Sequence, residues 1–415
     1  MYESEVWLMK WLENSGVTTP KGFEAAGIHA GIKNKKLDLG LIRATHVCPT
    51  AAVYTTNVVQ AGCIQVTKTH LHNQLAQAVV VNSGNANACT PRSKEDAEAT
   101  CQAVAAALHI DESDVIVAST GVIGQPLPLE KIKAKIPALV QQLASGAEAD
   151  AQISDSILTT DLIKKQAACR INIGGKDVTI AGIAKGSGMI HPKLATMLCF
   201  LTTDADISPD LLQKALSETT VPTFNSISVD GDTSTNDMST IMASGAAKNP
   251  PIVAQNDDYE TFKAALEAVC LVLAKKIVQD GEGATKLFTC VVHGAQTPQD
   301  AHTLALSVTS SSLVKTALTG ADANWGRILC AMGYAGVAFD AKTVEVAFES
   351  AVGAVTVCVD GMGLAFDEAL AKRILEEKEI TIAITIKTEN HTSSWTTYGC
   401  NLTNQYVEIN GSYRS

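Results

Sequence analysis

The spacing of apolar and polar residues along the chain predicts helices and strands mixed together, without a regular β-α-β alternation. Apolar residues recur at helical spacing in some segments, and short apolar runs bounded by turn residues mark strands in others. The predicted helices are 93–110, 129–144, 209–218, 258–279 and 366–377, and Ser93 is the expected N-cap of the first. The predicted strands include 78–82, 114–119, 197–203, 287–292 and 344–348.

Two segments give more detail about the sheets. Residues 167–173 and 177–183 flank the turn Gly174-Gly175-Lys176, which predicts a β-hairpin. Residues 197–201 are all apolar, without the alternation that one solvent-facing side would impose, which is typical of a strand buried between two layers. The pattern therefore predicts a mixed α and β fold that is not doubly wound.

Composition and charge indicate a soluble globular protein that acts on small molecules. The chain has 415 residues, of which 46% are hydrophobic and 18% charged, so it can bury two or three cores. The formal net charge is −11, and no cluster of more than a few Lys or Arg residues occurs. We therefore expect neither a nucleic acid nor an anionic membrane as partner.

The same patterning predicts a location in the cytoplasm. No apolar run approaches the roughly 18 residues needed to cross a bilayer, and the N-terminal stretch carries acidic residues where a targeting peptide would carry basic ones. The eleven cysteines are an odd number, without any C-x-x-C spacing. That pattern favours reduced, buried thiols over disulfides or a zinc site.

Several common functional motifs are missing from the sequence. Gly175-Lys176 lacks the other residues of a phosphate-binding P-loop, and no G-x-G-x-x-G follows a predicted strand. VDGDTSTND, at 229–237, places Thr235 where a calcium loop needs glycine. There is no H-E-x-x-H and no G-x-S-x-G. We expect no metal and no cofactor.

What remains is a set of small polar residues that interrupt apolar strands. STGVIG, at 119–124, predicts a turn at Thr120-Gly121 that either terminates a strand or forms an oxyanion hole. NSGNANACT, at 82–90, is either a capping loop or the polar lining of a pocket, and DGEG, at 280–283, caps the preceding helix. Thr196 stands alone where a glycine-rich stretch meets the apolar run 197–201, and the simplest interpretation is a strand start.

Taken together, these stretches resemble one family over essentially the whole chain. In chain order they are NSGNANACT, STGVIG, KGSGMIHPKLATML, VDGDTSTND, DGEGATK, GADANWGRIL and the terminal NGSYRS, which is the expected order. They resemble ornithine acetyltransferase, the glutamate N-acetyltransferase of cyclic arginine biosynthesis. The resemblance implies an α/β fold of the α+β type: a four-layer αββα sandwich similar to that of N-terminal-nucleophile enzymes, with a smaller C-terminal α/β domain.

The resemblance also implies self-cleavage between Ala195 and Thr196. An alpha chain, 1–195, and a beta chain, 196–415, would result, with the smaller domain at about 285–400 of the beta chain, and two copies of each chain would form a heterotetramer. Cleavage makes Thr196 an N-terminal residue, whose α-amino group, with an ordinary pKa of about 7.7–8.0, is a base for its own hydroxyl.

Site residues are implied by their places in the family's motifs. Thr196 resembles the catalytic nucleophile, and Thr120 and Gly121 resemble the oxyanion hole. The implied contacts to N-acetylornithine and glutamate are Thr159, Lys185, Thr196, Glu282, Asn410 and Ser415. Lys185 suits the α-carboxylate that both substrates share, and Glu282 suits an amine of ornithine. Family members end in Tyr-Arg-Thr, whereas this chain ends in Tyr-Arg-Ser, which keeps the hydroxyl and the carboxylate.

The family has members that also use acetyl-CoA as donor. This chain has no P-loop and no basic cluster for the phosphates of CoA, so we expect acetyl-CoA to be at best a poor donor. Two alternatives stay open. A threonine amidohydrolase or aminopeptidase would pass its acyl group to water, and a binding protein without catalysis would remain one uncut chain.

Overall fold

The structure is a computed structural model that describes residues 9–191, 197–388 and 391–411. The chain divides into two units. Unit 1 contains Met1–Gly186, Lys193–Phe224 and Thr233–Ala274, and unit 2 contains Ser187–Pro192, Asn225–Asp232 and Lys275–Ser415. Each unit has its own sheet and its own apolar core.

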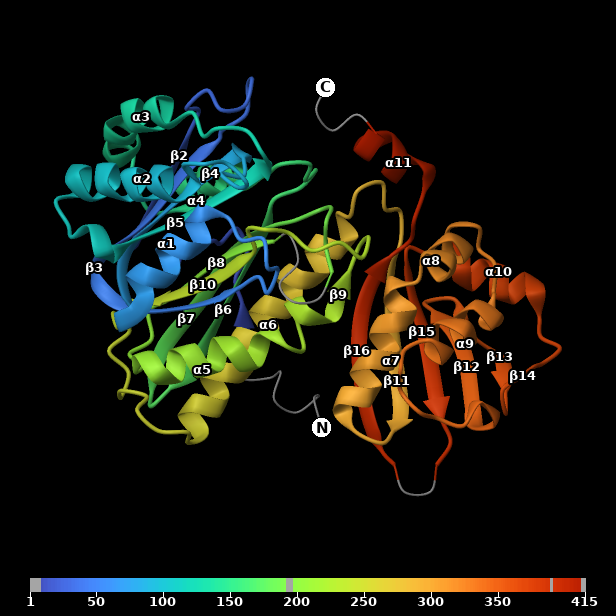
Figure 1. Ribbon diagram of the computed structural model, residues 1–415. Coiled ribbons are helices and arrows are strands. Elements are labelled where there is room, and N and C mark those ends of the chain that lie inside the picture. Colours follow the sequence, from blue (N-terminus) through green and yellow to red (C-terminus); the bar gives the residue numbers. More distant parts are fainter. Residues whose placement is uncertain (1–8, 192–196, 389–390, 412–415) are drawn as a thin grey trace. The chain divides into compact units, whose positions relative to one another are not determined.

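Unit 1 is built on a nine-stranded sheet with the order β1-β6-β7-β8-β10-β3-β4-β5, in which β2 also pairs with β3 (Figure 1). Its strands are β1 Lys10–Trp11, β2 Phe23–Ile28, β3 Leu39–Tyr54, β4 Leu75–Asn85, β5 Val115–Val122, β6 Lys165–Ile173, β7 Lys176–Lys185, β8 Leu198–Thr203 and β10 Met238–Ala243. The long strand β3 pairs with β2 and β4 through its first half and with β10 through its second half. Its exposed middle, residues 45–47, lies at a shift in register, so one strand contributes to both halves of the sheet.

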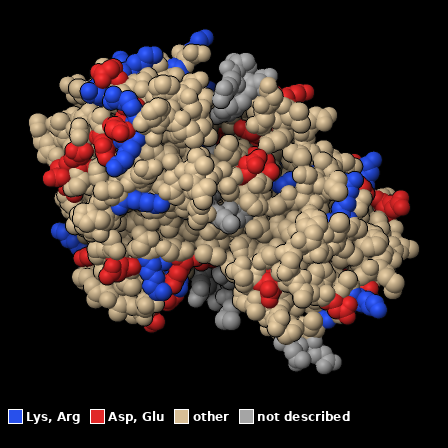
Figure 2. Space-filling view, in the orientation of Figure 1, with Lys and Arg blue, Asp and Glu red and all other residues tan. Residues whose placement is uncertain are grey.

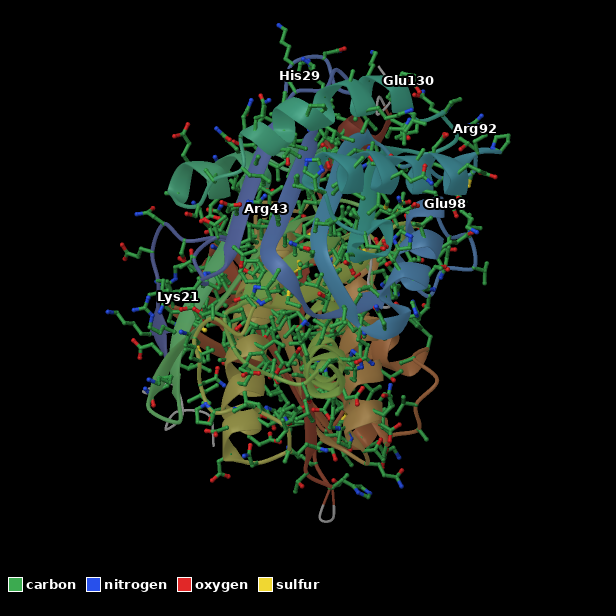
Figure 3. The ribbon with its side chains drawn as sticks, turned by 90° about the vertical axis from the view of Figure 1, so that its left-hand side faces the viewer. Lys21, His29, Arg43, Arg92, Glu98 and Glu130 are labelled. Carbon is green, nitrogen blue, oxygen red and sulfur yellow. The ribbon has the colours of Figure 1, made fainter. Side chains whose placement is uncertain are left out.

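Helices cover both outer faces of these strands. The helices of this part of the chain are α1 Gly62–His70, α2 Ser93–Leu108, α3 Leu129–Gln141, α4 Ala147–Ile157, α5 Pro209–Thr220 and α6 Asp257–Gln279. α1 and α2 pack on β5, α4 packs on β2 to β4, and α5 packs on β3 and β10. Figure 3 shows the labelled Arg92, Glu98 and Glu130 at the outer surface of the layer formed by α2 and α3.

Strand β8 lies in the interior and explains the unbroken apolar run in the sequence. Leu198 and Phe200 belong to the apolar cluster formed by β2 to β5, whereas Leu201 lies beside Leu273 of α6. Because both faces of β8 are covered, its apolar residues do not alternate with polar ones, and the two threonines that end the strand, Thr202 and Thr203, are buried and donate to main-chain carbonyls. Two β layers between helices confirm the predicted fold class.

Unit 2 forms a smaller α/β layer structure on a seven-stranded sheet with the order β14-β13-β12-β15-β11-β16-β9. Its strands are β9 Ile227–Ser228, β11 Leu287–Ala295, β12 Val344–Ser350, β13 Gly353–Val359, β14 Met362–Gly363, β15 Glu379–Ile386 and β16 Ser393–Cys400. Its helices are α7 Pro298–Ser310, α8 Ser312–Thr319, α9 Trp325–Gly333, α10 Glu368–Glu376 and α11 Asn404–Gly411. α7 packs on β11 and β16, and buried and partly exposed residues alternate along β12 and β15.

Most of the predicted elements are present, although several of them begin or end at other residues than predicted. The hairpin is confirmed, but its turn is Gly174-Gly175 alone, both at positive φ, and Lys176 already pairs with Ile173. Ser93 is not an N-cap: Arg92 occupies that position. The same helix ends at Leu108 rather than at 110, because His109 adopts a left-handed conformation that cannot continue it.

The cysteines agree with the expectation of reduced thiols. All eleven are free, and nine of them are buried, with Cys89 and Cys330 exposed. Burial raises the pKa of several of these thiols, Cys63 to about 11 among them. These groups are therefore protonated at neutral pH and act as small apolar core residues.

Candidate active site

The end of β5 carries Thr120 and Gly121 inside the strand, so the predicted turn at these residues is wrong. β4 runs alongside as far as Asn85, and Gly84 pairs with Gly121. The pairing is irregular here, since Asn85 pairs with both Thr120 and Val122. Gly121 has a φ of 135°, and a Cβ built on it would lie 2.5 Å from the amide nitrogen of Asn85. The bulge between the two strands therefore requires glycine at 121.

Lys185, the last residue of β7, reaches the side chain of Thr120. Its Nζ donates a hydrogen bond to Thr120 Oγ1 at 3.1 Å, and Lys185 is only 2% exposed. An ammonium group has donors and no acceptor, so Thr120 Oγ1 is the acceptor in this bond. The hydroxyl hydrogen of Thr120 is then left to donate elsewhere, as an oxyanion hole requires.

A buried ion pair lies beside this lysine. Asp161 Oδ1 accepts from Lys165 Nζ at 2.6 Å and from the Gly186 amide at 2.7 Å, and the amide of Thr159 donates to Asp161 Oδ2 at 3.0 Å. Burial alone would raise the pKa of Asp161, but the ammonium groups of Lys165 and Lys185 outweigh it and hold that pKa down to about 2. Asp161 is therefore ionised at neutral pH, and it fixes the backbone at both Thr159 and Gly186.

Asp237 is another buried carboxyl of unit 1, and its protonation state differs from that of Asp161. It is 1% exposed, and among the described residues neither of its carboxyl oxygens is in good hydrogen-bond geometry, although Met197 and Ser234 lie close enough to lower its pKa slightly. Burial raises the pKa of Asp237 well above its usual range, and the charge of Lys185 opposes this only in part. The next residue, Met238, donates from its amide to the Met197 carbonyl at 3.2 Å, so Asp237 lies near the start of β8.

The protonation of Asp237 predicts how stability depends on pH. The unfolded chain releases this proton near 3.8, whereas the folded chain keeps it to higher pH, so the contribution of Asp237 to the free energy of unfolding falls as pH rises above about 4. Asp237→Asn removes this dependence. The free energy of unfolding of the variant, relative to that of the parent, should therefore increase with pH by up to about 1.4 kcal/mol per pH unit. Urea unfolding at pH 4, 5.5 and 7 measures it, with Thr196→Ala in both proteins so that neither is cut.

Asp161→Asn is the control of opposite sign. The pKa of Asp161 is depressed, so this carboxylate stabilises the fold above its unfolded value and loses that contribution as pH falls toward about 2. Asp161→Asn should thus lower the free energy of unfolding at pH 7, and should lower it less at acidic pH. An Asp237→Asn effect that does not change with pH would contradict a protonated Asp237.

In unit 2, the structure brings together two other residues singled out from the sequence. Asn410 Nδ2 on α11 donates to Glu282 Oε2 at 2.7 Å, and Glu282 is buried in the segment after α6. The Glu282 amide donates to the Ser187 carbonyl at 2.9 Å. A Cβ on Gly188 would overlap the Glu282 carboxylate, so glycine at 188 leaves this group its place. Glu282 and Asn410 therefore form one polar pair.

The remaining predicted residues, Ala195, Thr196 and Ser415, lie outside the described residues. Sequence reasoning missed Asp161, Lys165 and Asp237. The signals were present: Asp161 closes the LTTD stretch that contains Thr159, and Asp237 ends the acidic motif that failed as a calcium loop. Among the residues that the structure describes, no three His, Cys, Asp or Glu side chains are grouped to hold a metal ion.

Basic and acidic side chains are interspersed on the face shown in Figure 2, where the described residues form no broad basic area. Within the described parts of the chain, no helix combines the length and the apolar character needed to cross a membrane.

Curated relatives match this chain over nearly its whole length. A protein of Bacillus cereus named "Arginine biosynthesis bifunctional protein ArgJ" is 48% identical over 406 residues, which cover 97% of this chain and 98% of the relative. A protein of the same name from Caldanaerobacter subterraneus subsp. tengcongensis is 47% identical over 401 residues, which cover 96% of this chain and 98% of the relative.

Solved structures of shorter chains are also similar. An arginine biosynthesis bifunctional protein from Bacillus halodurans is 44% identical with a TM-score of 0.42, covering 44% of this chain and 96% of its own. An ornithine acetyltransferase complexed with ornithine from Mycobacterium tuberculosis is 36% identical with a TM-score of 0.41, covering 44% of this chain and 98% of its own.

The model of the ArgJ family matches residues 24–415. This range includes every motif that carried the resemblance, from NSGNANACT at 82–90 to the C-terminus. Because the family model and the two relatives each cover most of the chain, the resemblance is confirmed and the chain belongs to the ArgJ family.

Proposed function

We propose that this protein is a glutamate N-acetyltransferase, which moves the acetyl group of N2-acetyl-L-ornithine to L-glutamate in arginine biosynthesis. The family membership supports this activity, and its curated relatives are named for arginine biosynthesis. The observation that carries the chemistry is the hydrogen bond from Lys185 to Thr120 Oγ1, because it leaves the Thr120 hydroxyl as a donor beside Gly121.

In the first half-reaction, the Thr196 hydroxyl attacks the acetyl carbonyl of N-acetylornithine. The α-amino group of Thr196 takes the hydroxyl proton as the Oγ–C bond forms. The carbonyl oxygen becomes an oxyanion, which the donors at Thr120 and Gly121 stabilise. When the intermediate collapses, the amide C–N bond breaks, the proton passes to the leaving nitrogen, and ornithine departs from an acetyl-threonine ester.

In the second half-reaction, glutamate takes the place of ornithine. Its α-amine attacks the ester carbonyl through the same oxyanion hole, and the Thr196 α-amine takes the proton that the glutamate nitrogen loses. The ester C–O bond then breaks, and this proton passes to Thr196 Oγ to restore the hydroxyl. Lys185 and Thr159 serve as contacts for the substrates in unit 1, and Lys185 suits the α-carboxylate that both substrates carry. Glu282 and Asn410 in unit 2, together with Ser415, complete the proposed contacts.

Self-cleavage prepares the nucleophile in this scheme. Peptide cleavage before Thr196 produces the chains 1–195 and 196–415 and creates the α-amine that serves as base. We expect the mature enzyme to contain two copies of each chain and to work in the cytoplasm. No cofactor is part of the mechanism, and acetyl-CoA would enter only as an alternative donor of the same acetyl group.

A single assay on purified protein tests the proposed activity. With N-acetylornithine and glutamate, we expect stoichiometric N-acetylglutamate and ornithine, with initial rates that follow ping-pong kinetics. Acetate released in place of N-acetylglutamate would identify an amidohydrolase or aminopeptidase and contradict the proposal. Acetyl-CoA in place of N-acetylornithine is expected to give a much lower kcat/KM. Comparable values would show that the bifunctional name of the relatives applies here too.

A further inference from the structure

The amide of Asn236 joins two strands at the oxyanion hole. Asn236 is 4% exposed, and its Nδ2 donates to the Ser119 carbonyl at 2.8 Å and to the Ala86 carbonyl at 2.6 Å. Ser119 precedes Thr120 on β5, and Ala86 directly follows β4. Both hydrogens of this NH₂ group are therefore used to connect the strands where their pairing is irregular.

The orientation of this amide follows from its neighbours. Asn236 Oδ1 accepts from the Thr235 hydroxyl at 2.5 Å, and the Asn236 amide nitrogen of the main chain donates to Ser234 Oγ. Two carbonyls on one side require the NH₂ group there, so the assignment of nitrogen and oxygen is fixed by the network. An aspartate, a leucine or an alanine at 236 would leave both carbonyls without these donors.

The bond to Ser119 acts on Thr120 through the peptide plane. The Ser119–Thr120 peptide is trans, so its C=O and its N–H point in opposite directions in one plane. A donor that fixes the Ser119 oxygen therefore fixes this plane and with it the Cα of Thr120, which carries the hydroxyl donor of the hole. Near a bulge, the regular main-chain hydrogen bonds between strands are interrupted and do not hold a peptide plane on both sides. The bond from Asn236 therefore restrains a rotation of the Ser119–Thr120 peptide plane that strand pairing alone would allow.

We infer that Asn236 is a positioning residue for acetyl transfer: by holding the Ser119 carbonyl, it sets the orientation of the Thr120 peptide and so of the oxyanion hole. The inference rests on the proposed function of Thr120 and Gly121. Asn236 lies within the VDGDTSTND motif, which does not fit a calcium loop. The inference therefore assigns this motif a positioning role in place of calcium binding. Asn236 itself touches no reacting atom in this scheme.

Asn249 provides a matched control for the test. It lies in the same unit, is also 4% exposed, and its Nδ2 also donates to two carbonyls, those of Asp206 and Pro250. Neither carbonyl belongs to β4, β5 or the motifs of the site. Asn236→Ala and Asn249→Ala therefore remove equivalent bonds, and both should lower the midpoint of urea unfolding by similar amounts.

Only the Asn236 variant should affect catalysis. We expect kcat for Asn236→Ala to fall about 10- to 100-fold, less than the roughly 10²- to 10³-fold cost of losing a hole donor outright, with KM changed less than about twofold. Ornithine release and acetyl transfer to glutamate should slow by the same factor, because one hole serves both half-reactions. Asn249→Ala should keep kcat within about threefold.

A double variant locates the effect. If Asn236 acts through the hole, Asn236→Ala combined with Thr120→Ala should reduce kcat by less than the product of the two separate factors. Should Asn236→Ala not fold, Asn236→Ser, which supplies one donor in place of two, takes its place, and we expect a smaller fall in the same direction.

Equal kcat values for the Asn236 and Asn249 variants, or fully multiplicative effects in the double variant, would overturn the inference. Failure of the proposed function would look different. A wild-type protein that releases acetate and makes no N-acetylglutamate would contradict the transferase, yet the Asn236 comparison would still be decided on acetate release, which uses the same hole.

Discussion

Replacing Thr196 with alanine should leave the chain uncut and without acetyl-transfer activity. The variant lacks the hydroxyl that attacks the acetyl carbonyl, and without cleavage it also lacks the α-amine that serves as base. On a denaturing gel we expect one band at the full mass of 43.6 kDa, whereas the parent should give two chains that mass spectrometry identifies as 1–195 and 196–415. Activity should fall to the background of the assay.

Two variants control this experiment. Thr196→Ser keeps the hydroxyl and should still be cut and retain measurable activity. Thr202→Ala removes another threonine hydroxyl, one on β8 that donates to the Val17 carbonyl at 2.7 Å. It should cost about 1 kcal/mol of stability and leave cleavage intact. Cleavage of the Thr196→Ala chain at the same bond would refute the mechanism.

The second large effect is expected at Gly121. A side chain here meets the backbone of Gly84 and Asn85, and the φ of 135° is one that L residues rarely adopt. Strain of about 1–3 kcal/mol and overpacking of about 1–3 kcal/mol should add, so Gly121→Ala should lose roughly 2–6 kcal/mol of stability or displace β5. Displacement would move the Thr120 donors and lower kcat by about 10²- to 10³-fold.

Gly124→Ala separates backbone strain from overlap. Gly124 also has a positive φ, 80°, but a Cβ on it meets no atom within 4 Å. This variant should show only the conformational part of the loss, with kcat close to the parent's. Thermal unfolding and steady-state kinetics of both variants measure the difference. If Gly121→Ala behaves like Gly124→Ala, the close approach of β4 and β5 has no catalytic importance.

The sequence alone predicted correctly those structural features that depend on residues adjacent in the chain. The hairpin follows from two consecutive glycines, because both turn residues need positive φ. The burial of β8 follows from the apolar run 198–201 without alternation, because a strand covered on both faces has no solvent-facing side that would favour polar residues at every second position. The motifs along the chain were sufficient to identify the family, because each motif reflects a separate requirement on the backbone or on side chains.

The sequence misjudged features that depend on a neighbouring strand. Thr120-Gly121 has the composition of a turn, yet it continues β5, because β4 runs beside it and supplies pairing partners that no local pattern contains. Ser93 has the side chain of an N-cap but is the first residue of its helix, with Arg92 at the N-cap position. For 82–90 the sequence left a capping loop and a polar lining open, and bonds of both kinds occur: Asn82 accepts from Ser119 of β5, and Asn87 donates to the Ser93 carbonyl.

The sequence by itself determined the fold class, the buried strand, the hairpin and the family, and it pointed to Thr120, Gly121 and Lys185 as residues of one site. Only the tertiary structure decided which groups form hydrogen bonds with these residues and their neighbours. Asn236 bonds to Ser119 across 117 positions of the chain, and Lys185 bonds to Thr120 across 65. It also decided that Asp161 is ionised while Asp237 holds its proton, because a carboxyl's pKa depends on burial and on neighbouring charges, which packing brings together and sequence spacing does not encode.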